Sequence, residues 1–364
     1  MESFTQSIKQ RFIIDYQGLE KLFYILSEQF TVIGPKVVKE LLRYEPLKSF
    51  EELALNCVNL EKAGFYKLER AEAPFTNTRP TNSLKDWLYP QERIILEIER
   101  DRESTIISPK VPSQNYCFFD VRACDLTALT IMNRALSKDP YYQTLKTKLF
   151  ILAVTCKYER ETCFCLATNA GPDIKRGYDL LLTALGEKFL IEIGSKRASQ
   201  IIEKLPYKRE AIPKDLREKH KILRDLKERL ASRFRIEKLA ERLPLCLTSS
   251  EWEKVEERCF ACGNCTMVCP TCFCFDIVEN NTLLFKRSSR VMRWDSCFSQ
   301  SFATINRYNL RESISSRYRH WILHKFYYSP LSFKRFSCVG CGRCITFCPA
   351  GIDLREEVLR VVSA

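Results

Sequence analysis

The middle of the chain alternates between short apolar runs and a helix-like pattern, and this order predicts a parallel sheet. YCFFDV (116–121) and KLFILAVTC (148–156) are continuous apolar runs, which are typical of buried strands. Between them, ACDLTALTIMNRAL carries apolar residues at helical spacing, with Asp125 as a candidate N-cap. A strand–helix–strand unit of this kind places its two strands side by side and parallel.

The flanking segments extend this mixture of helix and strand. GLEKLFYILSEQF has helical spacing, TVIGPKVV predicts a strand, and YDLLLTALGEKFLIEIG predicts a strand, a turn and a second strand. Residues 196–243 are highly charged and predict connecting helices. We therefore expect an α/β domain over residues 1–245.

Two cysteine runs near the C-terminus share one spacing. They read Cys259-x2-Cys262-x2-Cys265-x3-Cys269-Pro270 and Cys338-x2-Cys341-x2-Cys344-x3-Cys348-Pro349. In two-cluster ferredoxins, three cysteines of such a run hold one [4Fe–4S] cluster and the fourth crosses to the other cluster. We therefore assign Cys259, Cys262, Cys265 and Cys348 to one cluster, and Cys338, Cys341, Cys344 and Cys269 to the second.

A zinc ribbon and a disulfide framework are the alternatives for these runs. A third CxxC step followed by x3-Cys-Pro, occurring twice, favours iron–sulfur clusters because zinc needs only four ligands. A long and partly helical insert separates the two runs. The sequence thus predicts an α+β protein in which the N-terminal α/β domain is followed by a mainly helical two-[4Fe–4S] ferredoxin-type domain over residues 246–364.

Four further cysteines predict a third cluster in the N-terminal domain. Cys124 follows the first buried strand, Cys156 ends the next one, and Cys163 and Cys165 lie a short loop beyond. Parallel neighbouring strands would bring the first two cysteines to the same edge of the sheet, where ligands often bind. We expect a [4Fe–4S] cluster on Cys124, Cys156, Cys163 and Cys165, with ordinary packing cysteines or a zinc site as alternatives.

The remaining cysteines have less specific interpretations. Cys272, Cys274 and Cys297 could form an additional metal site, a redox-active thiol group or a structural one, and the sequence does not choose between them. Isolated cysteines elsewhere are expected to be packing residues; they are Cys57, Cys117 and Cys246.

Composition indicates in which compartment the protein is located. The chain has 364 residues with 18 cysteines, shows no signal peptide and has no apolar stretch of membrane-spanning length. Many thiols predict a reducing cytoplasmic location.

The net charge of +13 is compatible with a nucleic-acid partner. Basic and acidic residues are mixed along the predicted helices, however. We therefore expect that the chain binds no nucleic acid and that it docks onto an acidic protein partner. Residues 313–335 are the most basic segment, with Arg317, Arg319, Lys325, Lys334 and Arg335.

Several motifs together resemble one family. They are similar to the iron–sulfur β subunit of cytoplasmic [NiFe] sulfhydrogenases. The motifs are FDVRACDLTAL, TCKYERETCFC, CFACGNCTMVCPTCFCFDI, RWDSC and YSPLSFKRFSCVGCGRCITFCPAGI. The same elements resemble the 4Fe-4S dicluster subunit of anaerobic sulfite reductase. The resemblance spans roughly residues 115 to 355.

The resemblance implies an electron-transfer subunit of a multi-subunit oxidoreductase. Such a subunit works between a flavin- and NAD(P)-binding partner and a terminal hydrogenase, sulfite reductase or heterodisulfide reductase subunit. An alternative is an enzyme with its own substrate site at the cluster on Cys124, Cys156, Cys163 and Cys165. A second alternative is a DNA-binding iron–sulfur protein, which salt-dependent binding would reveal.

Overall fold

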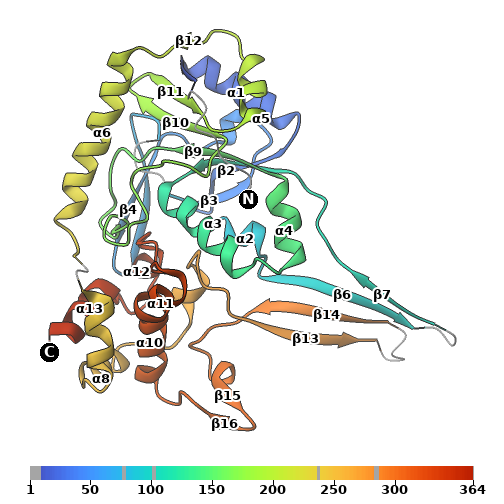
Figure 1. The fold of residues 1–364 in the computed structure, drawn as a ribbon, viewed down its shortest axis with the longest axis vertical. Coiled ribbons are helices and arrows are strands. Elements are labelled where there is room, and N and C mark those ends of the chain that lie inside the picture. The colour runs from blue at the N-terminus through green and yellow to red at the C-terminus, as the bar shows by residue number, and fades with distance from the viewer. Residues whose placement is uncertain (1–9, 76–78, 101–103, 236–237, 283–286, 364) are drawn as a thin grey trace.

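A mixed eight-stranded sheet forms the centre of the N-terminal part of the chain in the computed structural model (Figure 1). The structure describes residues 10–75, 79–100, 104–235, 238–282 and 287–363. In spatial order the strands are β12 (Arg209–Glu210), β1 (Arg11–Ile14), β11 (Lys188–Ile193), β10 (Leu180–Leu185), β9 (Leu149–Val154), β8 (Tyr116–Val121), β2 (Thr31–Val38) and β3 (Leu41–Pro46).

The predicted strand–helix–strand unit is confirmed. Strands β8 and β9 are parallel neighbours, and α3 (Ala123–Ala135) connects β8 to the segment before β9. Their residues are almost all buried, because helices cover both faces of the sheet. Strands β2 and β10 extend the parallel part, whereas β3, β11, β1 and β12 pair with antiparallel neighbours.

Two hydrophobic cores lie on opposite faces of this sheet. Phe118 belongs to one core and Phe119 to the other, because successive side chains of a strand point to opposite faces. The core around Phe119 includes residues of α1 (Tyr16–Ser27) and α5 (Lys196–Glu203). The core around Phe118 includes residues of α2 (Lys85–Leu88), α3 and α4 (Pro140–Thr147). The N-terminal region is therefore a three-layer α/β arrangement.

A second sheet has four antiparallel strands and extends away from the rest of the chain (Figure 1). Its order is β13 (Phe275–Asn281), β14 (Arg287–Trp294), β6 (Glu92–Arg100) and β7 (Thr105–Pro109). Strand β14 follows the predicted domain boundary at residue 245, yet it pairs with β6, which precedes that boundary. The division into 1–245 and 246–364 stays a prediction.

The C-terminal part is built from helices around a third hydrophobic core that includes Trp252, Tyr318 and Trp321. Its helices are α8 (Glu251–Glu256), α9 (Asn264–Met267), α10 (Ile314–Leu323), the π-helix η4 (His324–Tyr328), α11 (Ser329–Phe333), α12 (Arg343–Thr346) and α13 (Leu354–Ser363). Because β13 and β14 lie in the same part of the chain, an α+β fold is the description that holds, and the mainly helical character stays a prediction.

The remaining elements complete the described chain. They are η1 (Phe50–Glu52), β4 (Cys57–Lys62), β5 (Phe65–Arg70), α6 (Pro213–Ala231), α7 (Leu239–Arg242), η2 (Leu243–Cys246), η3 (Ser301–Ala303), β15 (Thr304–Ile305) and β16 (Tyr308–Asn309). Among the described residues, no helix combines the length and apolar character needed to cross a bilayer.

One expectation about a charged residue was wrong. Asp125 is not the N-cap of α3, since Arg122 occupies that position and the Asp125 carboxylate pairs with Arg343. The basic segment 313–335 is only partly exposed. Arg317 and Lys325 are buried, with 4% and 2% of their surface exposed. Burying a charge is costly unless a partner compensates it, so each of these side chains requires a local explanation.

Candidate iron–sulfur sites

The two cysteine runs fold into the same local structure. In each run a glycine in the left-handed region begins a short helix: Gly263 (φ 73°) precedes α9 and Gly342 (φ 81°) precedes α12. Glycine adopts this conformation without the steric penalty that a Cβ atom brings. Cys265 and Cys344, the third cysteines of the two runs, lie in these helices.

Site A is the group formed by Cys259, Cys262, Cys265 and Cys348. These four cysteines line one cavity, which is also bounded by Phe260, Tyr318 and Trp321. The group includes the fourth cysteine of the second run, as the crossover pattern of two-cluster ferredoxins predicts. Cys262 is exposed and Cys259, Cys265 and Cys348 are half-buried, so site A lies close to the protein surface.

Site B is the group formed by Cys269, Cys338, Cys341 and Cys344. It lines a neighbouring cavity together with Phe164 and Lys325. Here the fourth cysteine of the first run joins three from the second. Three of the four cysteines are at least 91% buried, as their exposed fractions of 7–9% show. Cys344 and Trp321 line both cavities, so sites A and B share a wall.

The donor set and the burial at both sites fit the implied cluster chemistry. The cavity of site A is lined by its four thiols and by Cys344, and the cavity of site B by its four thiols; the other lining side chains are mainly apolar, which is the environment that [4Fe–4S] clusters take in proteins. The sequence reasoning thus predicted which cysteines come together. That these eight cysteines are the ligands stays a prediction.

A buried ammonium group contacts site B directly. The Lys325 Nζ atom donates hydrogen bonds to Cys269 Sγ at 3.4 Å and to Thr271 Oγ1 at 3.3 Å. Burial acts to lower the pKa of Lys325, but the neighbouring thiols, Cys269 foremost, outweigh it and raise that pKa well above its ordinary value. The side chain is therefore charged at neutral pH.

Site C is the group formed by Cys124, Cys156, Cys163 and Cys165. Cys124 lies in the first turn of α3, and the other three lie in the segment after β9. Three of them belong to one small buried core, and Cys156 packs against it. Burial, and then the neighbouring Cys163 and Cys156, raise the pKa of Cys165 well above its ordinary value. The four predicted residues are thus brought together.

Sites B and C are in direct contact. Val339 and Cys341 from the second run lie in the same buried core as the cysteines of site C. The Phe164 backbone N–H, between Cys163 and Cys165, donates to the Gly340 carbonyl at 2.9 Å. The three groups therefore follow one another in the order A, B, C.

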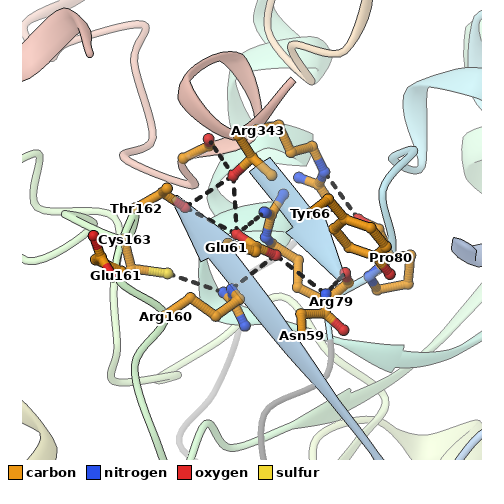
Figure 2. Close-up of polar contacts among 12 residues, drawn as sticks. Asn59, Glu61, Tyr66, Arg79, Pro80, Arg160, Glu161, Thr162, Cys163 and Arg343 are labelled. Atoms are coloured by element: carbon orange, nitrogen blue, oxygen red, sulfur yellow. Dashed lines mark hydrogen bonds and ion pairs between the residues drawn. The ribbon is translucent and has the colours of Figure 1, made fainter. Parts of the chain in front are cut away.

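A buried polar network supports site C, and Figure 2 shows Glu61 at its centre. The Arg160 Nη2 atom donates to Cys163 Sγ at 3.0 Å, and its Nε atom lies 3.8 Å from Glu61 Oε1. Glu61 also accepts from Arg79 at 2.6 Å and from the Thr162 hydroxyl at 2.9 Å. Burial acts to raise the pKa of Glu61, but Arg79 and then Arg160 outweigh it and hold that pKa below its ordinary range.

A second contact links this network to site B. The Thr346 hydroxyl, from α12, donates to Glu61 Oε2 at 3.1 Å. Glu61 comes from β4, so one strand from the N-terminal region connects the loop of site C with the helix that carries Cys344. The sequence reasoning missed Glu61, Arg160 and Lys325. Of these three residues, only Arg160 could have been linked to a site from the sequence, because it stands three residues before Cys163.

The spacing of the potential ligands bears on the zinc alternative. Across the described ranges, no three histidine, cysteine, aspartate or glutamate side chains are arranged to hold one metal ion. In a [4Fe–4S] cluster each thiolate binds a different iron, so the sulfurs stand further apart than the ligands of a single ion. All 18 cysteines lie within the described residues and are free thiols, which also leaves the disulfide framework without support.

The three unassigned cysteines near site B form a further thiol group. Cys272 is hydrogen-bonded to Cys269, and Cys274 is hydrogen-bonded to Cys297. The hydrogen bond from Cys297 lowers the pKa of Cys274 to about 7. Cys297 is buried, whereas Cys272 and Cys274 are half-buried. This arrangement distinguishes Cys274 as the most acidic of the three thiols.

Comparison with known proteins agrees with this geometry. Residues 258–352 match the family model of the 4Fe-4S dicluster domain. The chain is 30% identical over 346 residues to sulfhydrogenase 2 subunit beta of Pyrococcus furiosus, and the match covers 92% of each chain. No solved structure matches the chain.

The fold, the paired cysteine runs and the domain match define an iron–sulfur protein with [4Fe–4S] clusters. Such clusters carry single electrons, so the class is that of electron-transfer subunits. The chain belongs to the sulfhydrogenase beta-subunit family.

Proposed function

We propose that this chain relays single electrons within a multi-subunit oxidoreductase. Its partners would be a flavin- and NAD(P)-binding subunit and a terminal subunit of the hydrogenase, sulfite reductase or heterodisulfide reductase type. The observation that carries the proposal is the continuous order of sites A, B and C, in which each site contacts the next. Clusters held at these residues would supply one-electron chemistry.

The exposure of site A supports it as the end that faces a partner. Cys262 is exposed, and the neighbouring Phe260 keeps 69% of its surface exposed. An exposed aromatic side chain beside a redox site is suited to interface contact, because aromatic residues are enriched at interfaces. Sites B and C are more deeply buried, which excludes water and holds the cysteines in place.

A third [4Fe–4S] cluster at site C is part of this proposal. Four gathered cysteines support it, as does the Arg160 guanidinium, which donates to Cys163 and offsets the negative charge that thiolate ligands bring. Cys124, Cys163 and Cys165 have exposed fractions between 5% and 9%, so only the half-buried Cys156 offers sulfur surface to a substrate. The alternative of an enzyme with its own substrate site here is therefore less well supported. We also propose the reducing cytoplasm as the compartment, because all 18 cysteines are free.

The relay is tested in the purified complex with Cys341→Ser in site B. We expect electron delivery to the terminal acceptor to stop, while NAD(P)H oxidation with an artificial acceptor at the flavin partner continues. Cys246→Ser is the matched control, because Cys246 is half-buried and lies outside the three sites. Unchanged delivery in the Cys341→Ser complex would refute the relay.

The third cluster is tested by iron and acid-labile sulfide per chain after anaerobic purification. Three clusters require about 12 iron atoms and two require about 8. We expect Cys163→Ser to lower the iron content by about 4 atoms and Cys246→Ser to leave it unchanged. Full iron retention in Cys163→Ser, or about 8 iron atoms in the unaltered chain, would exclude a cluster at site C.

A further inference from the structure

Lys325 is a buried cation whose contacts are sulfur and hydroxyl groups. It lies in the π-helix η4 and has 2% of its surface exposed. Its Nζ atom donates to Cys269 Sγ at 3.4 Å and to Thr271 Oγ1 at 3.3 Å, and its side chain lines the cavity of site B. A lysine in such a position requires a negative counter-charge, because an uncompensated buried ammonium is very unfavourable.

Several buried cations near the three sites have carboxylate partners, whereas the buried Lys85 donates to the Met267 and Cys272 carbonyls. Arg343 pairs with Asp125, and Arg160 and Arg79 pair with Glu61. Within the described ranges, no aspartate or glutamate oxygen lies within 4.0 Å of Lys325 Nζ. The group in contact with Lys325 Nζ that can become negative is the Cys269 thiol of site B, at 3.4 Å. The counter-charge therefore has to come from site B.

The position of Lys325 is fixed by both cysteine runs. The Lys325 carbonyl accepts from the backbone N–H of Ser337, which immediately precedes Cys338. The Thr271 hydroxyl, which accepts from Lys325, donates to the Ser337 carbonyl at 2.6 Å. The backbone of Lys325 is thus bound to the second run, and its ammonium group is bound to Thr271 beside the first run. Both contacts hold the ammonium group next to site B.

Among the described residues, no cation donates to a sulfur of site A; the buried Arg317, whose charge acts on Cys259, donates instead to the Phe298 carbonyl at 2.7 Å. Among the described residues, the only hydrogen bond to a site A sulfur is from the Ala261 backbone N–H to Cys259 at 3.4 Å. The two sites therefore share the same kind and number of thiol ligands but differ by one buried positive charge in contact with a ligand sulfur. A positive charge favours the more negative, reduced state of a nearby redox group.

We propose that Lys325 is a positioning residue that raises the reduction potential of a cluster at site B above that of a cluster at site A. The inference rests on the proposed function, because it requires clusters at both sites. Since site B lies between sites A and C, electrons entering the chain would collect there before delivery. Lys325 acts through Cys269 and its fixed charge, and it takes no part in ligation.

The experiment is an EPR-monitored redox titration of the anaerobically purified chain and its Lys325→Met variant. We expect the equilibrium constant for reducing one cluster to fall at least tenfold, which for one electron is about 59 mV, while the other clusters are unchanged. Cys341→Ser identifies the affected signal, because that variant should lose it. Lys325→Arg retains the charge and should keep most of the potential.

Lys334→Met is the matched control, because it removes a lysine from the same segment at an exposed position. A shift below about twofold in Lys325→Met, equal shifts in all clusters, or the same shift in Lys334→Met overturns the inference. Should Lys325→Met lose iron, Lys325→Gln is judged by the same criteria, because glutamine retains a hydrogen-bond donor without the charge. Fewer than two clusters in the unaltered chain would instead refute the proposed function, and the inference with it.

Discussion

Arg343 and Asp125 form a buried two-pronged ion pair between positions that are 218 residues apart in the sequence. The guanidinium nitrogens lie 2.7 Å and 3.0 Å from the two carboxylate oxygens. Both side chains are almost completely buried. Arg343 immediately precedes Cys344 of site B, and Asp125 immediately follows Cys124 of site C. The pair therefore fixes the position of one cysteine group relative to the other.

Removing one member of this pair should destabilise the protein strongly. Asp125→Asn leaves the Arg343 charge buried without its counter-charge, and we expect the free energy of unfolding to fall by about 3–5 kcal/mol. Denaturant titration measures this change. Lys254→Ala breaks an exposed pair with Glu251 and should cost at most about 1 kcal/mol. Similar losses in the two variants would contradict the importance assigned to the buried pair.

A methyl group at Gly342 should disturb the contact between sites B and C. A Cβ atom there would lie 2.4 Å from Thr162 Oγ1 and 2.5 Å from the Thr162 carbonyl oxygen. We expect Gly342→Ala to lower both iron content and stability, because the clash adds about 1–3 kcal/mol to the cost of the left-handed backbone.

Gly177→Ala is the matched control for this change. Gly177 has a similar φ of +87°, but a Cβ atom there would meet no atom within 4 Å. It should therefore cost only the backbone penalty of about 1–2 kcal/mol and leave the iron content unchanged. Equal effects of the two substitutions, measured by thermal unfolding and iron analysis, would exclude the steric explanation.

Asp215 should make the stability of the α6 region depend on acidic pH. Hydrogen bonds from Arg209, and then from Lys188 and the Ile212 backbone, hold the pKa of Asp215 well below its usual range. The unfolded chain therefore binds the proton more readily than the folded chain. The stabilisation is complete above the unfolded pKa of about 4 and is lost as the pH falls through the lower folded pKa.

We expect Asp215→Asn to cost about 1–3 kcal/mol at pH 7 and progressively less below pH 4. Urea unfolding at several pH values gives this difference directly. A cost that stays constant between pH 7 and pH 3 would show that the charge of Asp215 is not the cause.

Cys274 should be the first of the unassigned thiols to react with an alkylating reagent. The thiolate is the reactive form, and a pKa of about 7 places half of Cys274 in that form near neutral pH. Mass spectrometry of peptides after brief iodoacetamide treatment should show Cys274 labelling that rises through pH 7, well before Cys297. Labelling of Cys274 only above pH 8.5, where an ordinary cysteine reacts, would contradict the predicted pKa.

The cysteine groups were predictable because their determinants are local or follow from regular structure. The x2 spacing brings three thiols of a run to one face, and the crossover of Cys269 and Cys348 follows from the pairing of two equal runs. Cys124 and Cys156 could be predicted to lie close together because neighbouring parallel strands end at the same edge of a sheet. Each of these inferences depends on positions close in sequence or on a repeated rule of strand pairing.

The charged residues around the sites were not predictable in the same way. Lys325 stands in a basic segment, and nothing beside it in sequence distinguishes it from the exposed Lys334. Its partner Cys269 is 56 residues away, and Glu61 meets Thr346 across 285 residues. Asp125 likewise looked like a helix cap, because its partner Arg343 lies in a different part of the chain.

The sequence alone determined that this is an α+β iron–sulfur protein, since hydrophobic periodicity and ligand spacing are properties of neighbouring residues. Only the tertiary structure decided which cysteines share a cavity wall, which site is exposed and which charges are buried beside sulfur. The physical reason is that the effect of a charge depends on the medium around it. Water screens Lys334 but is excluded from Lys325, and the folded chain alone makes that difference.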